Sequence, residues 1–159
     1  MAEKLLKRCE VPVEKTWRLE DIYETNEAWD ADYAKLSEQV DALKTYEGKP
    51  TDRAKLLEYC NLSTDAEQRL GSLYGYARMR RDEDNGNGLY QALTDRAMGL
   101  LVRFESEKAF FSPELMQLGS AKVRSFLEQE PALGEYKRYL EKELWLEKHT
   151  LSPEQEKLL

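Results

Sequence analysis

The side chains best suited to bind a metal ion lie in an acidic, glycine-containing run at residues 82–88. Carboxylate and amide oxygens beside glycine are typical of a calcium loop, in which glycine occupies position six and a bidentate glutamate occupies position twelve. Counted from Asp82, those two positions hold Asn87 and Leu93. Because this register fails, the run predicts a turn between two helices and no calcium site.

Zinc chemistry would depend on histidine, and His149 is the one histidine in the chain. A zinc peptidase site of the His-Glu-x-x-His type needs two imidazoles one helical turn apart, with a glutamate that activates the zinc-bound water. A single imidazole cannot supply that site. His149 stands just before a serine-proline helix start, a position more typical of a turn or packing residue than of a metal ligand.

Nucleophilic and redox chemistry also lack a pattern in this sequence. Cys9 and Cys60 are far apart and form no Cys-x-x-Cys pair, so we expect reduced thiols and neither a disulfide framework nor a structural zinc site. The sequence contains no nucleophile elbow and no phosphate-binding glycine loop. We therefore predict that the chain has no catalytic, cofactor-binding or metal-binding residue and holds no cofactor.

Charge narrows the range of partners. Lysine and arginine number 24 against 31 aspartate and glutamate residues, a formal net charge of -7, which argues against nucleic acid because phosphate binding needs a basic patch. The first residues are too polar for a signal peptide, and no apolar run approaches the roughly 20 residues needed to cross a bilayer. We expect a cytoplasmic protein that binds neither nucleic acid nor membrane.

The sequence predicts that the elements which would position any site are helices. Thr25 or Asn26 caps an amphipathic helix that Gly48 and Pro50 end. Its apolar residues recur at spacings of four and three: Trp29, Tyr33, Leu36, Val40 and Leu43. No segment has sustained strand alternation. The fold class is predicted to be all-α, an antiparallel bundle of long amphipathic helices with short connecting helices.

Further along the chain, Thr51 restarts a helix that residues 61–64 (Asn-Leu-Ser-Thr) could break or bend. Gly71 and Gly75 are four residues apart, where another helix could approach closely. Helices are then expected from Tyr90 to about 110, over 113–118 with Ser112 as cap, over 120–129 and over about 132–147.

Three segments follow from this pattern. Residues 1–15 form an extended or flexible amino-terminal arm, because Pro12 pushes its predecessor out of the helical region. Residues 16–150 form the helical domain. Residues 151–159 begin a further helix with capping-box spacing at Ser152, which runs for only about two turns, so we expect the chain to be a truncated piece of a longer protein.

The order and spacing of these pieces resemble the amino-terminal lobe of oligoendopeptidase F, a family of zinc metallopeptidases. The resemblance covers nearly the whole chain, although each piece is mostly a helix with its cap. The matching stretches are residues 8–14, 16–23, 27–29, 73–84, 90–97, 110–115 and 149–159.

The resemblance implies a complete enzyme that continues into a catalytic domain, where His-Glu-x-x-His and a further glutamate hold zinc and oligopeptides are hydrolysed. None of those functional residues maps onto this chain. The lobe is implied to wall the substrate channel and to restrict access to short peptides, with its own catalytic domain as partner; once severed, it could dimerise through an exposed docking surface. The alternative hypothesis is a free-standing helical adaptor that binds partner proteins.

Overall fold

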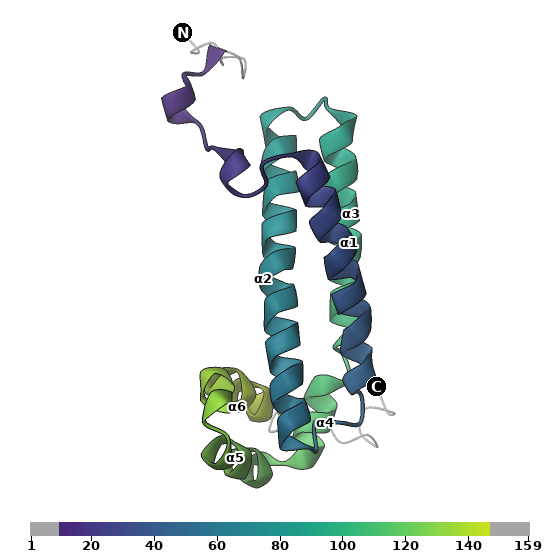
Figure 1. Cartoon of the computed structure of the whole chain (residues 1–159), viewed down its shortest axis with the longest axis vertical. Coiled ribbons are helices and arrows are strands. Elements are labelled where there is room, and N and C mark those ends of the chain that lie inside the picture. Colours follow the sequence, from purple (N-terminus) through teal and green to yellow (C-terminus); the bar gives the residue numbers. More distant parts are fainter. Residues whose placement is uncertain (1–9, 147–159) are drawn as a thin grey trace. The chain divides into compact units, whose positions relative to one another are not determined.

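The computed structural model describes residues 10–146, and every regular element within them is helical (Figure 1). The predicted all-α class is therefore confirmed. The α-helices are α1 (Asn26–Leu43), α2 (Arg53–Glu83), α3 (Gly88–Glu107), α4 (Phe111–Leu118), α5 (Ser120–Gln129) and α6 (Lys137–Leu146). Short 3-10 helices are η2 (Val13–Lys15), η3 (Leu19–Asp21), η4 (Lys44–Tyr46) and η5 (Pro131–Tyr136). Within this part of the chain, no helix is long and apolar enough to cross a membrane.

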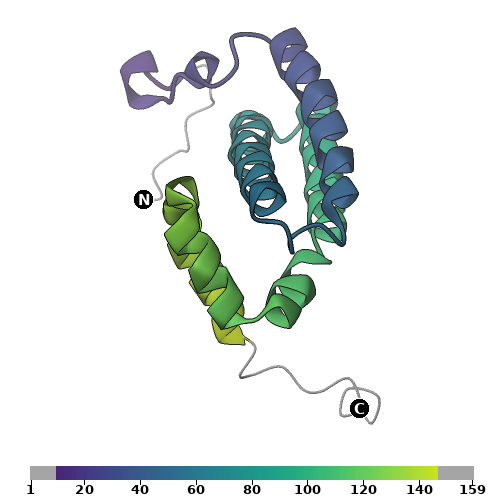
Figure 2. The same ribbon diagram turned by 60° about the horizontal axis from the view of Figure 1, so that its bottom comes forward.

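The described residues divide into two compact units. Unit 1 contains residues 10–40 and 65–104, and unit 2 contains residues 41–64 and 105–146. In unit 1 most of α1, the second part of α2 and most of α3 lie side by side (Figures 1 and 2). In unit 2 the short helices α4, α5 and α6 contact one another.

The core of unit 1 is built on the apolar stripe predicted for α1. Trp29, Leu36 and Val40 are fully buried. The Trp29 indole N–H also donates a hydrogen bond of 2.9 Å to the Leu73 carbonyl oxygen, which joins α1 to α2. Tyr33 is only half-buried and stacks on the Trp29 ring, with 5.3 Å between ring centroids. Full burial of one such apolar side chain contributes about 1.5–3 kcal/mol, so this stripe is a principal source of the unit's stability.

The core of unit 2 is an aromatic cluster. Tyr59 of α2 stacks on Phe111 of α4 at 4.3 Å between ring centroids, and Phe111 stacks in turn on Tyr139 of α6 at 5.8 Å. Tyr46 and Phe110 each form an edge-to-face pair with Tyr59. Offset and edge-to-face pairs of this kind add about 0.5–1.5 kcal/mol beyond area burial, so they hold these short helices against α2.

The start of α1 and the turn that follows the helix use the capping residue and the glycine that the sequence predicted. The Thr25 hydroxyl oxygen accepts a hydrogen bond of 3.2 Å from the Ala28 N–H, which is the expected cap. The α-helix ends at Leu43, η4 adds one tighter turn, and Gly48 then adopts a φ of 76°, a conformation that favours glycine. The Gly48 N–H donates to the Glu114 carboxylate at 2.8 Å, so the turn is bound to α4.

Residues 61–64 do not interrupt the helix: α2 runs unbroken from Arg53 to Glu83. Short polar residues lower helix propensity by only a few tenths of a kcal/mol each, and packing overrides that cost. Ser63 is buried, and Asn61 accepts a hydrogen bond of 2.6 Å from the Tyr136 hydroxyl. The start also differs, since the Asp52 carboxylate, and not Thr51, accepts a hydrogen bond from the Lys55 N–H.

Among the described residues, no other helix approaches Gly71 and Gly75 closely, so the expected close approach stays a prediction. A Cβ added at either glycine would meet nothing within 4 Å, and Gly71 is exposed. The spacing of these two glycines therefore has no packing role among the described residues.

Two elements in the carboxy-terminal half also differ from the sequence expectation. α4 begins at Phe111, so Ser112 lies inside the helix and its hydroxyl binds the Glu143 carboxylate instead of capping. The helix expected over about 132–147 is divided into η5 and α6, because Pro131 opens a 3-10 turn that extends to Tyr136. α5 begins and ends where the sequence predicted.

The predicted division into residues 1–15, 16–150 and 151–159 stays a prediction. Residues 1–9 and 147–159 lie outside the described structure, and with them Cys9, His149 and the helix start at Ser152. Within the predicted arm, residues 13–15 form η2, so this part is a helical turn.

Candidate functional site

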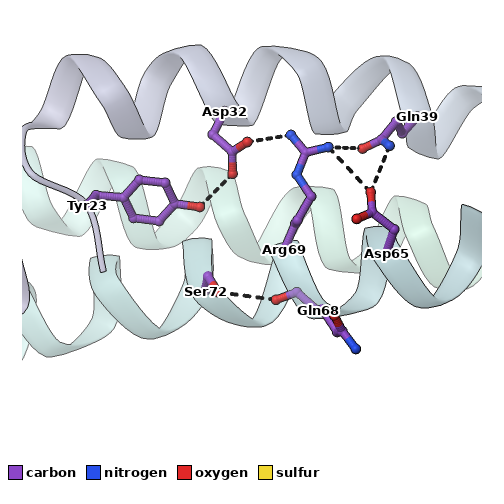
Figure 3. Close-up of polar contacts among 7 residues, drawn as sticks. All are labelled: Tyr23, Asp32, Gln39, Asp65, Gln68, Arg69 and Ser72. Carbon is purple, nitrogen blue, oxygen red and sulfur yellow. Dashed lines mark hydrogen bonds and ion pairs between the residues drawn. The ribbon is translucent and has the colours of Figure 1, made fainter. Parts of the chain in front are cut away.

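A cluster of charged and polar side chains in unit 1 joins α1, α2 and the segment before α1 (Figure 3). Asp32 of α1 lies at its centre. One carboxylate oxygen accepts a hydrogen bond of 2.6 Å from the Tyr23 hydroxyl, and the other forms an ion pair with the Arg69 guanidinium of α2. Arg69 and Asp32 are each about a quarter exposed, so the pair is partly shielded from water.

Two further side chains extend the cluster along the same two helices. Arg69 also donates to the Gln39 amide oxygen and lies 3.7 Å from the Asp65 carboxylate. The Gln39 amide nitrogen donates to that carboxylate at 2.9 Å. Asp32 and Gln39 are two helical turns apart on α1, and Asp65 and Arg69 are one turn apart on α2, which puts each pair on one face. We call these four residues, together with Tyr23, the Asp32–Arg69 network.

Environment fixes the protonation state of the network. Partial burial alone would raise the pKa of Asp32, but hydrogen bonds from Tyr23 and Arg69 outweigh burial and lower it. Burial and the neighbouring carboxylate together raise the pKa of the Tyr23 hydroxyl. Tyrosine therefore stays a proton donor and Asp32 stays ionised over the physiological range.

This arrangement is suited to joining α1, α2 and the segment before α1, and it is not suited to acid–base catalysis. A general base needs a free oxygen within reach of a substrate proton and a pKa near the working pH. Both Asp32 oxygens already accept from protein donors, and its pKa is shifted away from neutrality. The Asp32–Arg69 network thus holds α1, α2 and the segment at Tyr23 in one register.

A second cationic centre fastens α3 to α1. The Arg96 guanidinium lies 4.9 Å from the Trp29 ring centroid and 4.5 Å from the Tyr33 centroid, and it forms an ion pair of 2.7 Å with Asp30. Cation–π contacts contribute about 0.5–1 kcal/mol at exposed sites and more where water is excluded. This centre, too, is bound within the protein.

The segment that precedes α1, together with the end of α2, borders a pocket of about 360 Å³. Its walls are mainly apolar and include Val11, Trp17, Leu19 and Met79, with Asp82 and Glu83 also lining it. The Trp17 side chain is 80% exposed. Arg80, which forms ion pairs with Glu20 at 2.5 Å and with Glu83 at 3.1 Å, joins η3 to α2 beside this pocket.

Cys60 and the acidic run at residues 82–88, considered above as possible reactive or metal-binding groups, both have structural roles in the fold. Burial raises the pKa of the Cys60 thiol to about 12, which makes it a poor nucleophile. The acidic run forms the expected turn from α2 to α3, where Asp84 accepts from the Gly86 N–H at 3.0 Å. Across residues 10–146, no group of three potential metal ligands gathers. His149 lies outside the described residues.

Sequence reasoning did not single out the Asp32–Arg69 network. A signal was present, because Asp65 and Arg69 form an acid–base pair at spacing four on α2. Nothing in the sequence says which face of α1 meets that pair, so the partners Asp32 and Gln39 depend on how the two helices pack.

Comparison with known proteins gives one consistent result. A family profile described as oligopeptidase F matches residues 114–159. The chain is 37% identical over 159 residues to oligopeptidase PepF of Bacillus subtilis, which covers 99% of the chain and 24% of that protein. It is 31% identical over 153 residues to group B oligopeptidase PepB of Streptococcus agalactiae, covering 96% of the chain and 26% of that protein.

Solved structures share the fold. A putative peptidase from Chlamydophila abortus superposes with a TM-score of 0.83 at 27% identity, covering 98% of this chain and 26% of that one. Oligoendopeptidase-F from Enterococcus faecium gives a TM-score of 0.72 at 29% identity, covering 85% and 27%. The chain thus spans about a quarter of the length of the relatives it matches.

Proposed function

Because the chain belongs to the oligoendopeptidase F family and matches an amino-terminal region of its members, we propose that it is the non-catalytic lobe of a longer oligopeptidase. The observation that carries this proposal is the share of each protein that the matches cover. Relatives match nearly all of this chain with about a quarter of their own length. That proportion favours a lobe of a larger protein over a free-standing adaptor.

The family implies zinc, and the residues of this chain do not fit a zinc peptidase site. One histidine cannot supply the two imidazoles of His-Glu-x-x-His. Within residues 10–146, no three side chains of ligand type lie together. In the proposed enzyme the zinc would be held by the part of the protein that this chain does not contain.

The proposed role of the lobe is steric. The Asp32–Arg69 network and the Arg96 centre join the long helices of unit 1, and these helices would form one wall of a narrow channel over the active site. Such a channel would admit short, unfolded peptides to the catalytic domain and exclude folded proteins. The lobe's partners would be its own catalytic domain and the oligopeptide substrate, in a cytoplasmic enzyme.

The test uses the complete protein that carries this chain, assayed on quenched peptides of increasing length and on a folded protein with the same cleavage sequence. We expect chelator-sensitive hydrolysis that falls sharply beyond a length threshold. Removal of residues 1–159 should raise the cleavage of the longest substrates relative to the shortest.

The matched control is the 159-residue chain alone, incubated with zinc and the shortest peptide, which should stay intact. Circular dichroism must show that both pieces keep their helical content before the comparison is made. Hydrolysis by the chain alone, or an unchanged ratio of long to short cleavage after its removal, would contradict the proposal.

A further inference from the structure

The surface of α3 that faces away from the core of unit 1 is less charged than the outer surfaces of α1 and α2 and exposes large apolar side chains that those surfaces lack. Its core side is buried and consists of Leu93, Thr94, Ala97, Leu100 and Phe104. The opposite side is exposed and consists of Gly88, Gln91, Asp95, Met98, Gly99 and Val102. We call this second set the α3 outer face. Asp95 is its one charged residue.

Comparison within unit 1 makes the contrast clear. Over residues 26–40 of α1, four of the seven exposed residues carry charge, and the same holds for residues 65–83 of α2. Over residues 88–104 of α3, only two of the nine exposed residues carry charge. From Ala97 to Phe104 the exposed residues are Met98, Gly99 and Val102, and none is charged. Residues 68–77 of α2 likewise have no charged residue among their exposed ones, but they expose Gln68, Gly71 and Ser72, with no large apolar side chain among them. In a chain with 35% charged residues, a solvated helix face would be expected to resemble the first two.

The same two turns expose apolar side chains. Val102 is 66% exposed and Met98 is 40% exposed, one helical turn apart. Gly99 lies beside them, and a Cβ at this position would meet nothing within 4 Å. A glycine flanked by two exposed apolar side chains allows the axis of another helix to come close, because interaxial distance depends on the side chains at the contact.

We propose that the α3 outer face is the surface through which this lobe packs against an uncharged helix from the rest of its own polypeptide. This rests on the proposed function, in which the chain is one part of a longer protein. The same fold occupies 26% of the Chlamydophila abortus chain, so about three quarters of such a polypeptide is available to cover an apolar surface. The charged outer surfaces of α1 and α2 would stay hydrated.

Methionine oxidation tests the proposal directly. In the 159-residue chain, Met98 should react with hydrogen peroxide at the rate of an exposed methionine. In the complete protein its rate should fall at least tenfold, as measured by mass spectrometry of the α3 peptide. The matched reference is Ser72→Met on the exposed side of α2, where the new methionine should change rate by less than twofold between the two proteins.

A second variant keeps the test independent of oxidation chemistry. Val102→Lys should leave the thermal midpoint of the 159-residue chain within about a degree, since the position is exposed, and should raise the Met98 oxidation rate in the complete protein severalfold. Equal Met98 rates in the chain and the complete protein would overturn the proposal. So would concentration-dependent protection of Met98 in the chain alone with none added in the complete protein, which would identify a second copy as the occupant.

These readouts need neither zinc nor peptide hydrolysis, so they are separable from the channel role. If the complete protein shields Met98 but cleaves long and short substrates alike, the docking surface is supported and the channel role is refuted. If it discriminates substrates by length while Met98 stays fully reactive, the channel role is supported and the docking surface is refuted.

Discussion

Asp32 joins the Tyr23 hydroxyl to the Arg69 guanidinium, and the effect of its removal on stability should be measurable. Asp32→Asn removes the negative charge opposite Arg69 and leaves the guanidinium partly buried beside a neutral amide. Hydrogen bonds to charged groups contribute about 1.5–3 kcal/mol, and the remaining exposure of both side chains reduces that figure. We expect the free energy of unfolding, measured in urea, to fall by about 1–2 kcal/mol.

A matched control lies on the surface of the same unit. Arg18 and Asp21 form an ion pair of 3.2 Å, but their side chains are 78% and 70% exposed. Exposed pairs contribute at most about 1 kcal/mol, so Asp21→Asn should change stability far less than Asp32→Asn. Equal effects of the two substitutions would show that the Asp32–Arg69 network has no special weight.

The lowered pKa of Asp32 also predicts how stability depends on pH. Because the folded-state pKa lies below the ordinary value of 3.8, the ionised carboxylate stabilises the fold at every pH above 3.8. That contribution is lost as the pH falls through the lowered folded-state pKa. The margin between the parent chain and Asp32→Asn should therefore be constant from pH 5 to 7 and shrink below pH 3.8, as measured by urea titration. A margin that stays constant at low pH would argue against this assignment.

Among the elements, α2 is the one whose continuity the sequence left open, and Glu67 tests it. In an unbroken helix, Glu67→Pro removes the hydrogen bond to the Ser63 carbonyl and places the ring against it, which costs about 3 kcal/mol or more. If the helix restarted after residue 64, residue 67 would lie in a first turn, where proline is tolerated. We expect the large loss of unfolding free energy, with Glu67→Ala at this exposed site as the near-neutral control.

Helix ends were predictable where one residue determines them. Thr25 and Gly48 act through their own hydroxyl and backbone, so local chemistry is enough to find them. The same reasoning misplaced the start of α4, because the Ser112 hydroxyl binds Glu143, which is 31 residues away. Pairings between helices, such as Asp32 with Arg69 or Arg96 with Trp29, depend on which faces pack, and one sequence does not specify that. The sequence could therefore indicate the class and most elements but not the networks.

For the whole molecule, the shared helix α2 couples the two units. Residues 53–64 of α2 contribute Tyr59 to the aromatic core of unit 2, and residues 65–83 contribute Leu73 to the core of unit 1. Because each helical N–H donates to the carbonyl four residues earlier, loss of order in one part of α2 removes the hydrogen bonds that cross the boundary into the other part. Unfolding of either unit should then be linked to unfolding of the other.

Hydrogen exchange followed by mass spectrometry can measure this linkage with Asp32→Asn, which perturbs unit 1 alone. A loss of about 1–2 kcal/mol corresponds to roughly 5–30-fold faster exchange for amides that open by global unfolding. If the units unfold together, the slowest amides of α4 and α6 should accelerate by the same factor as those of α1 and α3. Acceleration confined to α1 and α3 would mean that the aromatic core of unit 2 survives without unit 1, and that α2 can fray at the boundary after Thr64 although it is continuous in the folded chain.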